Sequence, residues 1–333
     1  MGFFFSRPDQ VPDPLYVVTM VSNPDRYRTR WKLYQDFAGM VECAGVRLIT
    51  VEVAFGDREF TVTQPDNPDH VQLRTRSVLW HKENALNLGF QRLPADWRYA
   101  AWVDADVRPA RADWFNETVH MLQKHPVVQM WSEAVDLGPN YNEVQRHRSF
   151  AWCYREGMDL PDEPGYSGSA RRAKSTWYWH PGFAWAITRP AFDAVGGLID
   201  HAILGSADDH MARSLIGRVA PALHRGLTEA YRQRVLLWQR RAQAYLDSNL
   251  GYVPGRIDHF YHGPKKYRRY KSRWNILVDR AFDPDTDLKR NSQGVWELET
   301  LPGDARQAAL RDDLYRYFTQ RQEDSVLPED AGT

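Results

Sequence analysis

The sequence predicts an α/β fold organised around a mostly parallel sheet, and three observations support this prediction. Strand-like and helix-like segments alternate through the first 140 residues, which is typical of parallel strands connected by helices. Hydrophobic residues form 43% and charged residues 26% of the 333 residues, as expected of a globular protein with a sizeable core. An apolar run ends at two carboxylates, Asp104 and Asp106, and ligands bind beyond strand ends of this kind.

Each element of this sheet has its own signal in the first half of the chain. Residues 14–24 are rich in β-branched residues and end at a Ser-Asn-Pro sequence, so they predict a strand. Residues 25–45 carry aromatic residues near helical spacing and close at Gly45, so they predict a helix. The same criteria predict strands at residues 46–56, 98–103 and 127–138. They also predict a helix within residues 77–94 that ends at Gly89, and a second helix at residues 112–126.

The second half of the chain is less regular. Residues 155–175 are polar and carry Gly and Pro, which predicts a loop that could serve as a lid. Short helices are predicted at residues 189–197 and 206–217, and a long amphipathic helix at residues 226–249. From residue 271 the composition becomes that of a charged tail. We therefore divide the chain into four regions: residues 1–13, 14–140, 141–270 and 271–333.

Composition limits the functional classes. Lys+Arg and Asp+Glu both number 43, so no overall field would draw the whole chain to nucleic acid, and any basic surface must be local. The two cysteines, Cys43 and Cys153, lie far apart in the sequence, which favours a reduced, cytoplasmic setting. No apolar run approaches the roughly 20 residues of a membrane span, and no secretory signal is visible, so we expect no membrane span.

The pair Asp104 and Asp106 calls for a partner, because burying a carboxylate costs several kcal/mol unless it is paired or coordinated. Carboxylate oxygens at a strand end suit Mg²⁺ or Mn²⁺ carrying a substrate phosphate. The alternative is a helix cap with an acidic turn residue. The same spacing recurs in the sequence DPDTD at residues 283–287, where no apolar run precedes it, and there we expect a solvated turn.

Two further constellations carry chemistry. Residues 204–217 hold Asp208 and Asp209 after a serine, Ser206, that could cap the helix, so a purely structural reading is equally good. Residues 259–270, HFYHGPKKYRRY, hold two histidines and four Lys or Arg residues interleaved with tyrosines. A neutral imidazole could complete a metal site there, and the cations could neutralise a diphosphate. The alternative is a basic surface loop.

The order of these motifs resembles that of nucleotide-sugar glycosyltransferases of the GT-A fold. The resemblance covers roughly residues 15–270 and rests on five segments: KENALNLG, WVDAD, HPGFAWAITRPAFDAVGG, ADDHM and HFYHG. An acidic helix start after GFAWAITRPAFDAVGGL is similar to the galactosyltransferase-like members. The segment beyond residue 271 looks like the tails of phage-encoded glycosyltransferase-like proteins, which would place the protein in a bacterial or phage-infected host cytoplasm.

The resemblance implies a Rossmann-like, mostly parallel GT-A sheet. Residues 14–140 would bind the nucleotide sugar, residues 141–270 would bind the acceptor and catalyse transfer, and residues 271–333 would form a charged C-terminal extension outside the core. It also implies a Mn²⁺ or Mg²⁺ ion held on the donor diphosphate by Asp106, His262 and, as a third candidate, Asp104.

Asp208 would be the catalytic base of an inverting transfer, since a single base activates the acceptor hydroxyl. The usual Glu-Asp of the family is Ala207-Asp208 here, followed by Asp209, so Asp209 remains the alternative. The implied donor-binding residues are Glu52, Lys82, Asn84, Lys265, Lys266 and Arg269. The implied acceptor-binding residues are Trp179, Gly182 and Trp185, with Trp152 as a further aromatic. For Glu52, Lys82 and Asn84, a plain surface position is the alternative. For the tryptophans, the alternative is packing in the core.

The donor implied is a UDP-sugar, and the acceptor is either a hydroxymethylpyrimidine in duplex DNA or a glycan. For DNA, residues 256–273 would contact phosphates. Two other classes stay open. A nucleotidyltransferase would use the same strand-end carboxylates, although no Gly-rich phosphate loop follows the first strand. A non-catalytic protein that binds sugar or nucleic acid would have no need of the three acids Asp104, Asp106 and Asp208 together.

Overall fold

A seven-stranded sheet forms the centre of the protein in the computed structural model, which describes residues 13–158, 160 and 178–327. Its strands are β1 (Leu15–Ser22), β2 (Arg47–Phe55), β3 (His70–Thr75), β4 (Tyr99–Val103), β6 (Val127–Gln129), β10 (Ala184–Thr188) and β11 (Leu250–Tyr252). Their order is β11-β6-β10-β4-β1-β2-β3. Strands β1 to β4 pair in parallel, and β10 runs antiparallel to both of its neighbours. The predicted α/β class with a mostly parallel sheet is thus confirmed.

A second, five-stranded sheet has the order β5-β12-β7-β8-β9. Its strands are β5 (Val107–Pro109), β7 (Glu133–Leu137), β8 (Glu143–Ser149), β9 (Tyr178–His180) and β12 (Arg256–His259). The single strand predicted at residues 127–138 is therefore wrong, because it divides into β6 and β7, which belong to different sheets. Strands from both predicted halves of the chain, residues 14–140 and 141–270, share each sheet.

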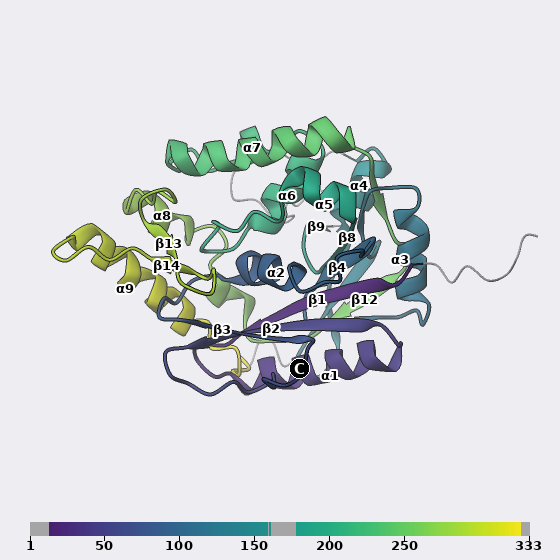
Figure 1. Cartoon of the computed structure of the whole chain (residues 1–333), viewed down its shortest axis with the longest axis horizontal. Coiled ribbons are helices and arrows are strands. Elements are labelled where there is room, and N and C mark those ends of the chain that lie inside the picture. The colour runs from purple at the N-terminus through teal and green to yellow at the C-terminus, as the bar shows by residue number, and fades with distance from the viewer. Residues whose placement is uncertain (1–12, 159, 161–177, 328–333) are drawn as a thin grey trace, which may run out of the picture.

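Helices cover both faces of the central sheet (Figure 1). They are α1 (Arg28–Cys43), α2 (Lys82–Phe90), α3 (Trp114–Leu122), α4 (Phe150–Arg155), α5 (Arg189–Val195), α6 (Ala207–Leu215) and α7 (Glu229–Leu246). Alternate residues of β1 point to opposite faces: Val17 joins a core with Phe37 of α1, whereas Val18 joins the core beneath α2 and α5 to α7. None of the helices in the described ranges is long and apolar enough to cross a membrane.

Helix α2 lies unusually close to the sheet at Gly89. A Cβ atom at this position would lie 2.6 Å from a methyl group of Val18 and 2.8 Å from one of Val51. We expect Gly89→Ala to destabilise the fold by about 1–3 kcal/mol, because the added methyl overpacks the interface. Gly39→Ala in α1, where nothing lies within 4 Å of the added Cβ, is the matched control and should be neutral or mildly stabilising. Urea unfolding of both variants checks the prediction, and equal stabilities would contradict it.

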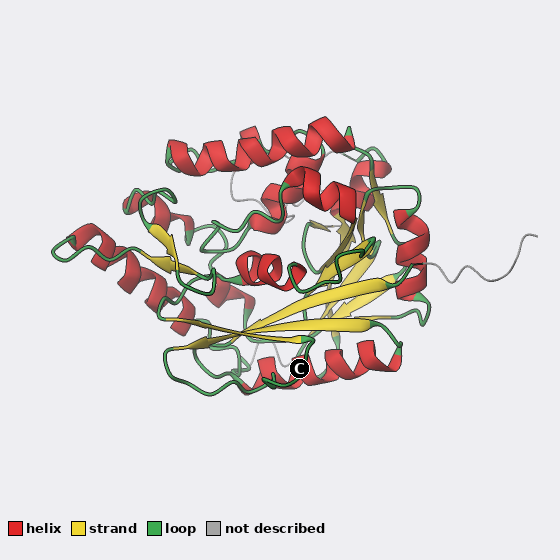
Figure 2. Ribbon diagram, in the orientation of Figure 1, coloured by secondary structure: helices red, strands yellow, loops and turns green. Residues whose placement is uncertain are grey.

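The region after residue 271, predicted as a charged C-terminal extension, packs against the main hydrophobic core. It forms α8 (Trp274–Asp279), a hairpin of β13 (Leu288–Arg290) and β14 (Trp296–Leu298), and α9 (Ala305–Thr319), which lie together at one end of the molecule (Figure 2). Apolar residues of each element join the core beneath α2. The solvated turn expected at residues 283–287 is wrong for Asp287, which is fully buried and pairs with Arg306.

Two predictions fall largely on parts of the chain outside the described residues. The N-terminal tail at residues 1–13 is described only at its last residue, and the lid predicted at residues 155–175 only at residues 155–158 and 160.

Candidate functional site

A cavity of about 210 Å³ opens beyond the carboxyl ends of β1 and β4. The first turns of α2 and α6, the end of β12 and two stretches of the C-terminal region complete its wall. The cavity collects acids and cations from segments far apart in the sequence: Arg30, Lys82, Glu83, Asp104, Asp106, Asp208, Asp209, His259, His262, Arg268, Arg273, Arg321 and Glu323.

Asp106, His259 and His262 form a cluster with the composition of a metal site. One ligand atom from each lies within 4.8 Å of the others. The Oδ2 atom of Asp106 is 3.2 Å from Nε2 of His262 and 3.8 Å from Nε2 of His259, and the two Nε2 atoms are 3.3 Å apart. Burial and the neighbouring Arg268 lower the pKa of His262 to about 4, so its imidazole is neutral at pH 7 and can coordinate a metal.

The residues fit a divalent ion. The Oδ1 atom of Asp106 is buried and has no hydrogen-bond partner among the described residues, a state that costs free energy unless a ligand or water satisfies it. One carboxylate and two imidazoles suit Mn²⁺ and other first-row divalent ions that accept nitrogen and oxygen ligands.

Backbone hydrogen bonds hold this cluster in register. The amide of Asp104 donates to the carbonyl of Phe183, 2.8 Å away, and the amide of Phe260 donates to the carbonyl of Asp106, 2.9 Å away. His259 ends β12, which pairs with β5 directly after Asp106. The strand-end carboxylate and the HFYH segment, distant in sequence, therefore meet through strand pairing.

Asp104 lies in the same cavity but serves a different partner. Its carboxylate forms an ion pair with the ammonium group of Lys82 at the first turn of α2. It is not a member of the Asp106 cluster, so of the two carboxylates Asp106 is the one that the geometry offers to a metal. The ammonium of Lys82, predicted to bind donor, reaches the cavity as a partner of Asp104.

The two acids at the start of α6 have different surroundings. Asp209 is buried and forms an ion pair with Arg213, 3.1 Å away; burial outweighs that pair and raises the pKa of Asp209 to about 6. Asp208 is half-buried and lines the cavity, with its Oδ1 atom accepting a hydrogen bond from the amide of Asp209. Ser206 does not cap α6, because its left-handed backbone places its hydroxyl against Arg273 instead.

Gly182, predicted to bind acceptor, lies against Asp208. A Cβ at this position would approach within 2.7 Å of the Oδ2 atom of Asp208. The two tryptophans predicted with it are core residues: Trp185 is 3% exposed and stacks on Trp102, and Trp179 is 7% exposed. Neither lines the cavity formed by the described residues. Their burial agrees with the packing alternative, and their acceptor role stays a prediction.

Two predicted donor-binding residues, Glu52 and Asn84, form hydrogen bonds with backbone groups elsewhere in the chain. The carboxylate of Glu52 accepts hydrogen bonds from the amides of Thr61, Val62 and Thr63, at 2.6–3.0 Å, and so shapes the loop after β2. The Asn84 side chain bonds the carbonyl of Gly294 and the amide of Trp296, which fixes the β13–β14 hairpin. Neither side chain lines this cavity, and Glu52 lines a separate cavity beside the end of β2. The donor role of both residues stays a prediction.

In the basic segment at residues 265–273, the cationic side chains that line the cavity are not the ones that were predicted to bind donor. Lys265 contacts Asp136 and Gln145, and Lys266 and Arg269 are exposed; none of the three lines the cavity. Arg268 and Arg273 do line it. Arg268 contacts the hydroxyl of Tyr270 and the ring of His262, and Arg273 is buried with its Nε atom unpartnered. Sequence spacing alone could not tell which side of this short 3-10 helix, η2 (Lys265–Arg268), faces inward.

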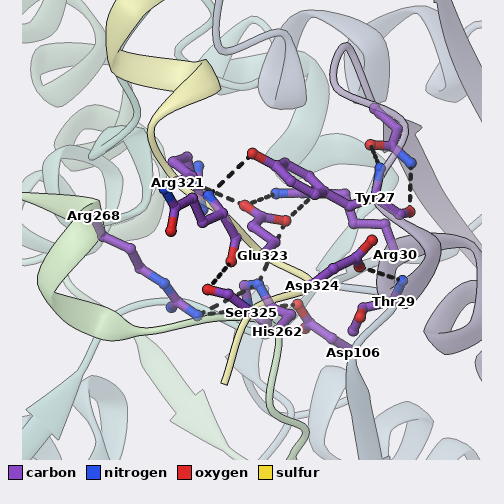
Figure 3. A network of polar contacts seen from close by, with 12 residues as sticks. Tyr27, Thr29, Arg30, Asp106, His262, Arg268, Arg321, Glu323, Asp324 and Ser325 are labelled. Atoms are coloured by element: carbon purple, nitrogen blue, oxygen red, sulfur yellow. Dashed lines mark hydrogen bonds and ion pairs between the residues drawn. The ribbon is translucent and has the colours of Figure 1, made fainter. Parts of the chain in front are cut away.

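Sequence reasoning missed the contribution of the chain after α9. We call residues 320–325 the C-terminal strap; it crosses the cavity beside His262 (Figure 3). Glu323 is 2% exposed and forms ion pairs with Arg30 and Arg321, while its Oε2 atom lies 3.9 Å from Nδ1 of His262. The polar sequence QRQEDS gives no apolar signal, so nothing in it indicates burial.

Comparison with known proteins yields structures but no sequence family. No protein-family model and no curated protein sequence matches the chain. Among solved structures, the chain is similar to the catalytic domain of Drosophila β1,4-galactosyltransferase 7 in complex with xylobiose, with 11% identity over 87% of this chain and 95% of that one and a TM-score of 0.34. It is also similar to S. aureus TarS (11% identity, 71% and 73% covered, TM-score 0.31).

A third similar structure is 4-diphosphocytidyl-2C-methyl-D-erythritol synthase from Anaerococcus prevotii (9% identity, 73% and 88% covered, TM-score 0.32). Because these identities and TM-scores are low, we base the functional proposal on the geometry of the site and on the sequence motifs.

Proposed function

We propose that the protein is a metal-dependent glycosyltransferase of GT-A type that moves a sugar from a nucleotide-sugar donor, most simply a UDP-sugar, to an acceptor hydroxyl. The observation that carries this proposal is the content of one cavity. It combines a carboxylate–imidazole cluster for a divalent ion, four arginines that line the wall, two of them from residues 268–273, and a separate carboxylate on α6. The motif order along the chain supports the same activity.

In this proposal, each charged residue of the cavity has a separate role. Asp106, His259 and His262 would hold Mn²⁺ or Mg²⁺, and the ion would supply positive charge opposite the nucleoside diphosphate leaving group. Arg268 and Arg273 orient the diphosphate through charge-assisted hydrogen bonds. Asp208 accepts the proton of the acceptor hydroxyl as its oxygen attacks the anomeric carbon, and a single base of this kind gives inversion. Asp104 and Lys82 keep each other oriented at the cavity wall.

The test of this proposal is the binding of UDP with and without Mn²⁺ by calorimetry, followed by product analysis. We expect UDP and Mn²⁺ to bind synergistically, because three ligands leave coordination positions for phosphate oxygens. Slow metal-dependent hydrolysis of a UDP-sugar without acceptor would distinguish a glycosyltransferase from a nucleotidyltransferase or a binding protein. Asp106→Asn is the matched variant and should remove the synergy. Equal UDP affinity in Mn²⁺ and in EDTA would contradict the metal role.

The basic segment supplies an internal control for donor binding. We expect Arg268→Ala to weaken UDP binding about 10–100-fold, since a hydrogen bond to a charged group contributes about 1.5–3 kcal/mol. The double variant Lys266→Ala/Arg269→Ala should leave UDP affinity unchanged, because both side chains lie outside the cavity. Titration calorimetry checks both results. The opposite order of effects would return the donor role to Lys266 and Arg269.

The acceptor is a hydroxyl of a glycan or of a hydroxymethylpyrimidine in duplex DNA, and the exposed cations distinguish the two. If Lys266 and Arg269 contact phosphates of a DNA backbone, the logarithm of duplex affinity should fall linearly with the logarithm of salt concentration. The slope should be about −0.9 per phosphate contacted. The same double variant should flatten that slope. Absence of duplex binding by the wild type at low salt would leave the glycan acceptor.

A further inference from the structure

Behind the proposed metal cluster lies a buried carboxylate, Asp136 on β7, that the transfer reaction does not use. Its side chain is 6% exposed. The Oδ1 atom accepts a hydrogen bond from Nδ1 of His259 at 2.7 Å, and the Oδ2 atom accepts one from Nε2 of His147 at 2.6 Å. The ammonium group of Lys265 contacts the same Oδ2 atom.

Strand pairing brings Asp136 to His259. Strands β7 and β12 are parallel neighbours, and Asp136 stands directly beside His259 in their register. Side chains of register partners point to the same face of a sheet. The contact is therefore built into the sheet, and it joins a residue of the second sheet to a ligand of the cluster.

The hydrogen bond fixes which nitrogen of His259 can coordinate a metal. A carboxylate oxygen only accepts, so the proton of a neutral His259 must lie on Nδ1. The lone pair is then on Nε2, the atom that faces Asp106 and His262 at 3.8 and 3.3 Å. The ring of Phe183, with its centroid 4.6 Å from that of His259, packs beside the imidazole and limits its rotation.

We propose that Asp136 is a positioning residue that holds His259 in the tautomer and orientation required for metal binding. This inference rests on the metal site of the proposed function and extends it to a residue that touches neither metal nor substrate. A carboxylate behind a ligating histidine raises its basicity and fixes its ring. The role also accounts for Lys265, whose charge compensates Asp136 and is not directed at the donor.

The experiment measures Mn²⁺ affinity of the full chain by calorimetry for wild type, Asp136→Asn and His147→Gln. Loss of a residue behind a metal ligand costs about 10–100-fold in affinity, and we expect this loss for Asp136→Asn. His147→Gln replaces the imidazole donor to the other carboxylate oxygen with a more flexible amide donor and should keep near-wild-type affinity. Equal losses in the two variants would mean that Asp136 only supports the β7–β8 pairing and would overturn the proposal, as would unchanged affinity of Asp136→Asn.

A second readout needs no metal. In ¹⁵N-detected spectra of the metal-free protein, we expect His259 to carry its proton on Nδ1 in the wild type and in His147→Gln, and to lose this preference in Asp136→Asn. Thermal unfolding monitors whether each variant folds. A wild type that binds no Mn²⁺ but shows the Nδ1–H tautomer would refute the metal role in the proposed function while keeping the positioning of His259. A wild type with the proton on Nε2 would overturn the positioning itself.

Discussion

Replacing Asp208 with asparagine should lower the rate of sugar transfer about 10²–10⁴-fold, the usual contribution of a general base. Donor affinity should stay close to wild type, because the base acts on the acceptor in the transition state and not on the bound donor. Steady-state kinetics with a UDP-sugar, together with UDP titration calorimetry, measure the two quantities separately.

Asp209→Asn is the control, and the structure separates the two acids clearly. Asp209 is buried against Arg213, so its replacement leaves a buried arginine without its partner and should reduce stability, whereas Asp208 lines the cavity. We therefore expect the rate defect in Asp208→Asn and the larger drop in the melting temperature in Asp209→Asn. A rate defect confined to Asp209→Asn would move the base by one residue.

The parts of the fold that could be predicted are those with a local signal. The run of β-branched residues in β1 and the aromatic periodicity of α1 predicted both elements within a few residues. Strand β3 was missed although its sequence HVQLRT alternates half-buried and buried residues, a pattern typical of a half-buried strand. The division between β6 and β7 depends on pairing with β10 and β12, which local sequence does not encode.

The same distinction separates the site residues. Asp106 stood out because a buried strand led into it, and His262 because the family resemblance implied it as a metal ligand. His259 lies in the same segment, but its role depends on β12, a strand that was not predicted. Glu52 and Asn84 had suitable chemistry at suitable strand and helix ends, yet backbone groups from later segments use their hydrogen-bonding capacity. Those long-range partners are not visible in the sequence.

The C-terminal strap carries the last prediction. Glu323 is a buried acid between two arginines: it bonds Arg30 of α1, 2.7 Å away, and Arg321, 2.8 Å away. Breaking a buried ion pair by removing one partner costs about 3–5 kcal/mol, since the other charge stays buried. We expect Glu323→Ala to destabilise the protein by this amount and to release the strap from the cavity. Urea unfolding and hydrogen exchange of residues 320–325 measure the two effects.

The neighbouring acid Asp324 offers a matched control, because it is more exposed and caps the start of α1. Its carboxylate accepts hydrogen bonds from the amides of Arg28 and Thr29, a capping contribution of about 1 kcal/mol.

A Gly263→Ala variant tests the strap without removing a charge, since the added Cβ would lie 2.5 Å from Cα of Glu323. Because Glu323 and its close packing against Gly263 hold the strap at the cavity wall, Glu323→Ala and Gly263→Ala should both speed hydrogen exchange in residues 320–325. Asp324→Ala should cost less stability than Glu323→Ala. Equal costs for Glu323→Ala and Asp324→Ala would show that the strap is held by its backbone contacts alone, such as the amide of Gln322 on the Tyr27 hydroxyl.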